Sequence, residues 1–307
     1  MKTRYGSVAV LLCLILVVSM GLTAVLGVNA PKTTNDLSVV ASFYPLYTAA
    51  LNVVGSCDGV TVSCLTQPTT GCLHDYQLSP SERAVLGEAD VLIQNGAGME
   101  PFLEPILHSL PTLTVIDTSA HMELLSGDEH DHAHEHDHSE NAHVWVDPEF
   151  YTEQVRRLRD GLCAADPAHA EEYTVNAAVY LTKIEQLGQA LKSVELPFTH
   201  ALLFHDSMVY AARALGLEVV GNIPLGEDRF ASANDLMNIA EALKGKAVLL
   251  LYDEQYPAMH ESLGGYADKA GIVRWNTAVH PTHGVAAKDA WLYAMGQNIK
   301  MLKEAVS

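Results

Sequence analysis

The sequence predicts an α/β protein built from two similar lobes that one long helix joins. Three observations support this fold class. Short apolar runs alternate with helix start signals in the first half of the chain, the alternation resumes after Pro197, and a long helical pattern separates the two halves. The chain has 307 residues, of which 49% are hydrophobic and 18% are charged. This composition is typical of folded globular proteins and excludes disorder throughout.

The first lobe is expected to contain a sheet with crossover helices. Its strands are predicted at residues 37–43, 59–65, 90–94 and 112–116. Before the third of these strands, Ser79 stands as an N-cap, with Pro80 at the first helical position and Glu82 three residues after the cap, so a helix should begin there. Residues 143–146 predict another short strand, which runs into a helix start at Asp147.

The connecting helix is predicted over residues 166–196. Apolar residues continue at helical spacing from Tyr173 to Val194, and at about 1.5 Å per residue such a helix would span roughly 40 Å. That length exceeds the width of a small domain, so the helix is expected to join two lobes. The first lobe would then cover residues 31–165 and the second residues 197–307. Within the second lobe, strands are expected at 201–204, 218–221, 247–252 and 272–275, with helices at 206–216 and 232–245 and a closing helix around 291–302.

The first thirty residues predict an export signal. Lys2 and Arg4 precede a mostly apolar stretch, 7–28, which has no charge. The end of this stretch has the small-residue spacing of a cleavage site, yet its length also suits an uncleaved membrane anchor. An extracytoplasmic protein is therefore expected, in the periplasm or at the outer face of the cytoplasmic membrane, with residues 1–30 as signal peptide or signal anchor. Disulfides persist outside the cytoplasm, and the sequence does not choose among the pairings of Cys57, Cys64, Cys72 and Cys163.

Charge and histidine content limit the partners. The formal net charge of −19 repels phosphate backbones, which argues against nucleic acid as a partner. The chain holds 15 His, and six of them fall between positions 130 and 143, which points to a transition metal. Residues 127–141 have no large apolar residue and no period, so we expect a mobile loop that gathers metal weakly. Its histidines are His130, His132, His134, His136 and His138.

The His-rich segment also matches the metalloprotease pattern H-E-x-x-H at residues 134–138. That chemistry needs two His residues on one helical face with Glu as the base. Here every second residue is His, so a chance match is expected. A secreted zinc hydrolase is therefore the least favoured interpretation of the sequence.

A tight zinc site needs about three or four ligands from separate elements, which a single flexible run does not fix in place. Single His residues at the ends of predicted strands satisfy this requirement, because ligands bind at that edge of open α/β sheets. The three positions that meet the test are His74, His143 and His205. A fourth ligand should come from the second lobe, where His280 is favoured over His283, and a carboxylate such as Glu254 or a water molecule is the alternative.

Several short motifs follow one another over residues 37–307. They are Ser42-Phe43-Tyr44-Pro45, Leu73-His74-Asp75-Tyr76 with Leu78-Ser79-Pro80, Asn95-Gly96-Ala97-Gly98-Met99-Glu100, His143-Val144-Trp145-Val146-Asp147-Pro148, and Phe204-His205-Asp206 with Gly216-Leu217-Glu218-Val219-Val220-Gly221. Each motif alone is weak, but their order is specific. At these residues the chain resembles the metal-specific solute-binding proteins of ABC importers, the cluster that takes up zinc or manganese.

The resemblance implies two lobes joined by a rigid helix, with one metal buried in the cleft and His74, His143 and His205 as ligands. It also implies that zinc-type members carry a His- and acid-rich loop before the second ligand, which this sequence has at 127–141. One departure concerns the fourth ligand. Members commonly place an acidic residue after the last strand, whereas here His280 stands near that place, which shifts the expected metal away from manganese.

The expected function is capture of Zn²⁺ and its delivery to the membrane permease of an ABC metal importer, by a monomer that is not an enzyme. Two alternatives remain beside the hydrolase. One is a manganese-binding (Mn²⁺) member of the same family, and the other is a surface protein that buffers zinc or acts as an adhesin.

Overall fold

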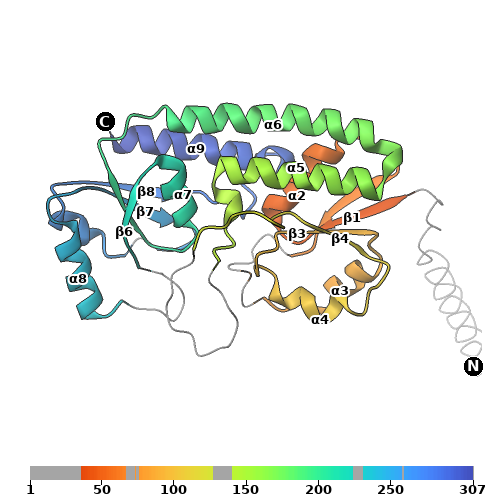
Figure 1. Ribbon diagram of the computed structural model, residues 1–307, viewed down its shortest axis with the longest axis horizontal. Coiled ribbons are helices and arrows are strands. Elements are labelled where there is room, and N and C mark those ends of the chain that lie inside the picture. Colours follow the sequence, from red (N-terminus) through yellow and green to blue (C-terminus); the bar gives the residue numbers. More distant parts are fainter. Residues whose placement is uncertain are drawn as a thin grey trace, which may run out of the picture. The chain divides into compact units, whose positions relative to one another are not determined.

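The computed structural model describes residues 36–66, 73, 76–126, 140–223, 231–257 and 259–306. The predicted export signal at 1–30, residue His74 and the histidines of the segment 127–141 lie outside these residues. Residues 37–307 form one compact unit. It contains two four-stranded parallel sheets with helices packed on them. Figure 1 shows β1, β3 and β4 apart from β6, β7 and β8.

The first sheet has the strand order β2-β1-β3-β4. Its strands are β1 (Leu37–Ala41), β2 (Val60–Cys64), β3 (Val91–Gln94) and β4 (Thr114–Asp117), and its helices are α2 (Tyr44–Val54), α3 (Pro80–Gly87), the short α4 (Glu104–Leu107) and α5 (Pro148–Ala165). The four predicted strands are confirmed within a few residues. The predicted start of α3 is also confirmed, because Ser79 and Glu82 form a capping box.

One predicted strand of the first lobe is wrong. Residues Val144–Val146 form a 3-10 helix, η3, in which the Asp147 amide bonds to the Val144 carbonyl. All three side chains of η3 are buried. A short apolar run that is buried on every side has no alternation of exposed and buried positions, so its periodicity does not distinguish a strand from a helical turn.

The second sheet repeats the topology of the first, with the order β6-β5-β7-β8. Its strands are β5 (His200–Leu203), β6 (Glu218–Asn222), β7 (Ala247–Asp253) and β8 (Lys269–Trp275), and its helices are α7 (Met208–Leu215), α8 (Ala233–Leu243) and α9 (Ala290–Ala305). The prediction of two similar parallel α/β lobes is therefore confirmed.

The long helix is α6 (Ala170–Lys192), with 23 residues. The Asp166-Pro167 start signal produces a 3-10 turn, η4 (Pro167–His169), and the α-helix begins after it. Helix α6 packs against α2 and α5 of the first lobe and against α7 and α9 of the second lobe. Figure 1 shows α6 beside α5 and α9. Its buried stripe joins a core that contains residues of both lobes. The members of the stripe are Tyr173, Ala177, Tyr180, Ile184 and Leu191.

Three of the four candidate disulfide cysteines lie in the described residues. Cys57, Cys64 and Cys163 are free thiols there, and Cys72 lies outside the described part of the chain. Burial raises the pKa of the Cys64 thiol to about 12, so this group stays protonated near neutral pH. In the same described part of the chain, no helix is both long and apolar enough to cross a membrane.

Candidate metal centre

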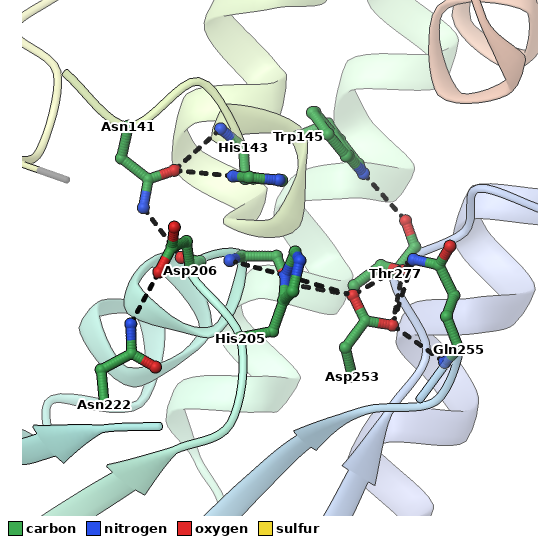
Figure 2. Close-up of polar contacts among 10 residues, drawn as sticks. Asn141, His143, Trp145, His205, Asp206, Asn222, Asp253, Gln255 and Thr277 are labelled. Atoms are coloured by element: carbon green, nitrogen blue, oxygen red, sulfur yellow. Dashed lines mark hydrogen bonds and ion pairs between the residues drawn. The ribbon is translucent and has the colours of Figure 1, made fainter. Parts of the chain in front are cut away.

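Two of the three histidines predicted at strand ends face each other. His143 precedes η3 in the first lobe, and His205 follows β5 and precedes α7 in the second lobe. Their ring centroids are 5.3 Å apart and the ring planes are 82° apart. Only 7% of His143 is exposed, and only 13% of the His205 side chain. Two imidazoles from different halves of the chain thus meet in a largely buried place (Figure 2).

Asn141 holds His143 in this position. The Asn141 Oδ1 atom accepts a hydrogen bond from the His143 backbone amide at 3.0 Å and lies 2.9 Å from the ring Nδ1. The carbonyl of Ala142 accepts a hydrogen bond from Asn95 Nδ2 at 2.9 Å. Because Asn95 follows directly after β3, the first sheet fixes the backbone that leads into His143.

His205 is held through its Nδ1 atom as well. Ser207 Oγ lies 2.7 Å from this nitrogen, and the Ser207 hydroxyl donates to Asp253 Oδ2 at 3.0 Å. Asp253 ends β7 and is 1% exposed. The ring of Tyr256 stacks on the His205 imidazole, with centroids 4.9 Å apart.

Sequence reasoning did not assign a role to Asn141 or Ser207, and it considered Asp253 only together with Glu254, as a possible carboxylate ligand. A signal was available, since Asn141 stands two residues before one candidate ligand and Ser207 two residues after the other. Asp253 shares the carboxyl edge of the second sheet with His205, because Asp253 ends β7, His205 follows β5, and these two strands are parallel neighbours. Only the folded chain shows that these side chains touch.

The other candidate ligands of the second lobe differ from one another in their exposure to solvent. His280 is half-buried, while His283 and Glu254 are exposed. Among the residues that the structure describes, no three His, Cys, Asp or Glu side chains are arranged so that they could hold a metal ion. Two imidazoles do not complete a zinc site, which takes three or four ligands, so further donors are needed beside His143 and His205. The nitrogen chemistry of this pair suits a transition metal such as zinc.

Comparison with known proteins places the chain in a family. The model of the family described as "Zinc-uptake complex component A periplasmic" matches residues 39–305. The chain belongs to this family. It is 26% identical to the zinc-binding lipoprotein AdcA of Streptococcus pneumoniae, over 90% of this chain and 57% of that protein. The chain therefore spans little more than half the length of this relative.

Two further matches cover most of both chains, one to another protein and one to a single domain of AdcA. The high-affinity zinc uptake system protein ZnuA of Bacillus subtilis strain 168 is 26% identical, over 83% of this chain and 82% of that protein. The crystal structure of the Zn(II)-bound ZnuA-like domain of Streptococcus pneumoniae AdcA has a TM-score of 0.68 and is 25% identical, covering 88% of this chain and 99% of that one. The resemblance inferred from the sequence motifs is confirmed by these matches.

Proposed function

We propose that this protein captures zinc outside the cytoplasmic membrane and delivers it to the permease of an ABC-type metal importer. The observation that carries the proposal is the buried pair of His143 and His205, each of which is held through Nδ1. Membership of the zinc-uptake family supports the same conclusion. The metal is the cargo of such a protein, which acts as a monomer and is exported by its first thirty residues.

The donor set favours zinc over manganese. Imidazole nitrogens suit zinc, whereas manganese prefers carboxylate, carbonyl and water oxygens. The carboxylate beside His205 belongs to Asp253, and its oxygens already accept hydrogen bonds from Ser207 and Gln255. A manganese-binding role would need oxygen ligands from elsewhere in the chain.

The same contacts argue for binding over hydrolysis. A zinc hydrolase needs an open coordination position and a general base near the bound water. Asp253 is the buried acid beside His205, and donors surround it, so it is poorly placed to take a proton from water. A zinc-buffering or adhesin role has no comparable support from the described residues.

Zinc affinity of single variants tests the proposal. His74→Ala, His143→Ala and His205→Ala should each weaken zinc binding by about 100-fold or more, measured by competition with a chelator of known affinity, because each removes one of few ligands. His169→Ala is the matched control, since His169 is likewise held through its Nδ1 atom, by the Asp166 carboxylate at the start of α6. Parent-like affinity in all three variants would show that the site lies elsewhere.

The candidates for the fourth ligand can be ranked by how much their substitution lowers zinc affinity. We propose His280, so His280→Ala should lower zinc affinity more than His283→Ala, and Glu254→Ala should lower it least. The half-buried position of His280 and the exposure of the other two support this order. The same competition assay measures it, and the largest loss in Glu254→Ala would move the fourth ligand to the carboxylate.

A further inference from the structure

We propose that Asn141, Ser207 and Asp253 are positioning residues that keep the neutral imidazoles of His143 and His205 protonated on Nδ1. Nε2 is then the nitrogen that each ring offers to the metal. The inference rests on the proposed function for its purpose, but the protonation pattern itself exists in the metal-free protein and is measured there.

The orientation of the Asn141 amide decides the proton at His143. Its Nδ2 group lies 2.8 Å from the backbone carbonyl oxygen of Asp206, which only accepts hydrogen bonds. The other end of the amide faces the His143 backbone N–H, which only donates. Both partners therefore place Oδ1 toward His143. Because Oδ1 is an acceptor, the ring Nδ1 that lies 2.9 Å away must carry the proton.

Asp253 decides the proton at His205 through Ser207. The groups around its carboxylate are donors: the Gln255 backbone amide at 3.1 Å, the Gln255 side-chain amide at 3.2 Å and the Ser207 hydroxyl at 3.0 Å. Ser207 has a single hydroxyl proton, and it points to Asp253. The Ser207 oxygen is then left as an acceptor for an N–H at His205 Nδ1, 2.7 Å away.

One contact opposes this arrangement. The Ser207 backbone amide lies 3.1 Å from His205 Nδ1 and would favour an unprotonated nitrogen there. The buried carboxylate of Asp253 takes the Ser207 hydroxyl proton, so the contact between Ser207 Oγ and His205 Nδ1 is a hydrogen bond only if Nδ1 donates. We infer that the hydroxyl contact outweighs the backbone amide contact, so that the proton of the neutral ring stays on Nδ1.

Asn141 also joins the two histidines to each other. Its Oδ1 contacts the His143 ring, and its Nδ2 bonds to the backbone of Asp206, which is adjacent to His205 in sequence. The carbonyl of Asn141 accepts a further bond from Tyr210 on α7 at 2.8 Å. Figure 2 shows the contacts of Asn141 with His143 and with Asp206. A first-lobe and a second-lobe ligand are thus set in one arrangement before metal arrives, which lowers the cost of ordering them on binding.

The decisive variant is Asp253→Asn. The Gln255 backbone amide cannot turn, so the Asn oxygen must face it and the Asn NH₂ must face Ser207. Ser207 then accepts from this NH₂ and turns its own proton toward His205, which moves the ring proton to Nε2. In metal-free protein labelled with ¹⁵N-histidine, the ring couplings should show His205 changing from the Nδ1–H to the Nε2–H form, with His143 unchanged. Zinc affinity should fall by about 10- to 100-fold.

Further variants separate the two positioning chains. Ser207→Ala should also convert His205 to the Nε2–H form, while Ser207→Thr, which keeps a hydroxyl, should preserve the parent form. Asn141→Leu should release His143 and leave His205 as it is. Asp166→Asn is the matched control, because Asp166 also accepts from a histidine Nδ1, that of His169, at the junction of α5 and α6. It should change neither the two tautomers nor zinc affinity.

The outcomes distinguish this inference from the proposed function. An Nε2–H form of His205 or His143 in the parent protein, or an unchanged His205 tautomer in a folded Asp253→Asn variant, overturns the inference whatever the zinc affinity. If the parent shows both Nδ1–H forms but binds zinc no better than His143→Ala, the inference holds and the proposed zinc function fails.

Discussion

At the scale of single residues, Glu100 links the first sheet to the candidate metal centre. Its carboxyl group accepts hydrogen bonds from Ser42 Oγ at 2.6 Å and from the amides of Asn95 and Gly96 at 2.7 and 3.1 Å. Asn95 in turn holds the Ala142 carbonyl beside His143. Gly96 has a φ of +78°, and a Cβ there would lie 2.1 Å from an Asp117 oxygen, so only glycine fits this turn.

The buried carboxyl of Glu100 should make stability depend on pH. Burial raises its pKa to about 7, against the opposing effect of its three hydrogen bonds. The folded state therefore binds more protons than the unfolded state between about pH 4.5 and 7, and the stabilisation from protonated Glu100 is lost as pH rises through that window. Relative to Glu100→Gln, the parent should lose roughly 2–3 kcal/mol of unfolding free energy from pH 5 to pH 8.

Urea unfolding at several pH values measures this difference. Groups other than Glu100 titrate in both proteins, so their contributions largely cancel in the comparison. A parent-minus-variant difference that stays constant from pH 5 to pH 8 would mean that Glu100 titrates alike in the folded and unfolded states.

At the scale of elements, Asp147 joins helix α5 to helix α7. Its Oδ1 accepts the Glu149 amide at 2.7 Å and so caps the start of α5. Its Oδ2 accepts from Arg213 of α7 at 2.6 Å. The Asp147 side chain is 2% exposed and that of Arg213 is 36% exposed, so water screens this ion pair only from the arginine side.

Removing the Asp147 side chain should therefore lower the free energy of unfolding more than removing an ordinary N-cap does. Asp147→Ala should lower the free energy of unfolding by about 2–4 kcal/mol, since a cap and a charged hydrogen bond are both lost. Ser232→Ala, at the exposed capping box of α8, is the comparison and should cost about 1 kcal/mol. Equal losses in urea unfolding would show that the Arg213 contact adds nothing to the cap.

At the scale of the whole molecule, two tryptophans tie the lobes together next to the candidate centre. Trp145 Nε1 of η3 donates to the Thr277 carbonyl, which follows β8, at 2.9 Å. Trp291 Nε1 of α9 donates to the Trp145 carbonyl at 2.9 Å. The backbone that carries His143 is therefore anchored to the second lobe as well as to the first sheet.

The His-rich segment is expected to gather zinc without forming the tight site. Ser126 and Glu140 form an antiparallel bridge, and the Asn141 amide bonds to the Leu125 carbonyl at 2.8 Å, so the two ends of the segment already lie together. Replacing residues 128–139 with a short glycine linker should thus keep one tight zinc per protein with nearly unchanged affinity. The additional weak sites should disappear because the histidines that form them are removed. These tethered ligands raise the local zinc concentration but do not form the tight site.

Calorimetric titration with zinc measures both classes of site in the deletion variant. Uptake by cells should suffer only when zinc is scarce, which growth at limiting zinc can check. Loss of the tight site itself would identify a histidine of the segment as a true ligand of the centre.

The sequence by itself determined the α/β class, the repeated lobe and the long helix. Hydrophobic periodicity reports which face of an element is buried, and capping residues mark where a helix begins. The Ser79–Glu82 capping box and the stripe of α6 were readable for that reason. It also singled out His143 and His205, since parallel strands end at one edge of a sheet. Whether they bind metal remains a prediction.

Only the tertiary structure decided what surrounds these two histidines. Asn141 contacts the backbone of Asp206, and Ser207 contacts Asp253, across separations of 65 and 46 residues. No local pattern encodes such pairs, because hydrogen-bond partners depend on how separate elements pack. The 3-10 turn η3 was missed for a related reason. Its three apolar side chains are buried by neighbours from distant parts of the chain, so tertiary packing, and not alternation along the run, set its backbone conformation.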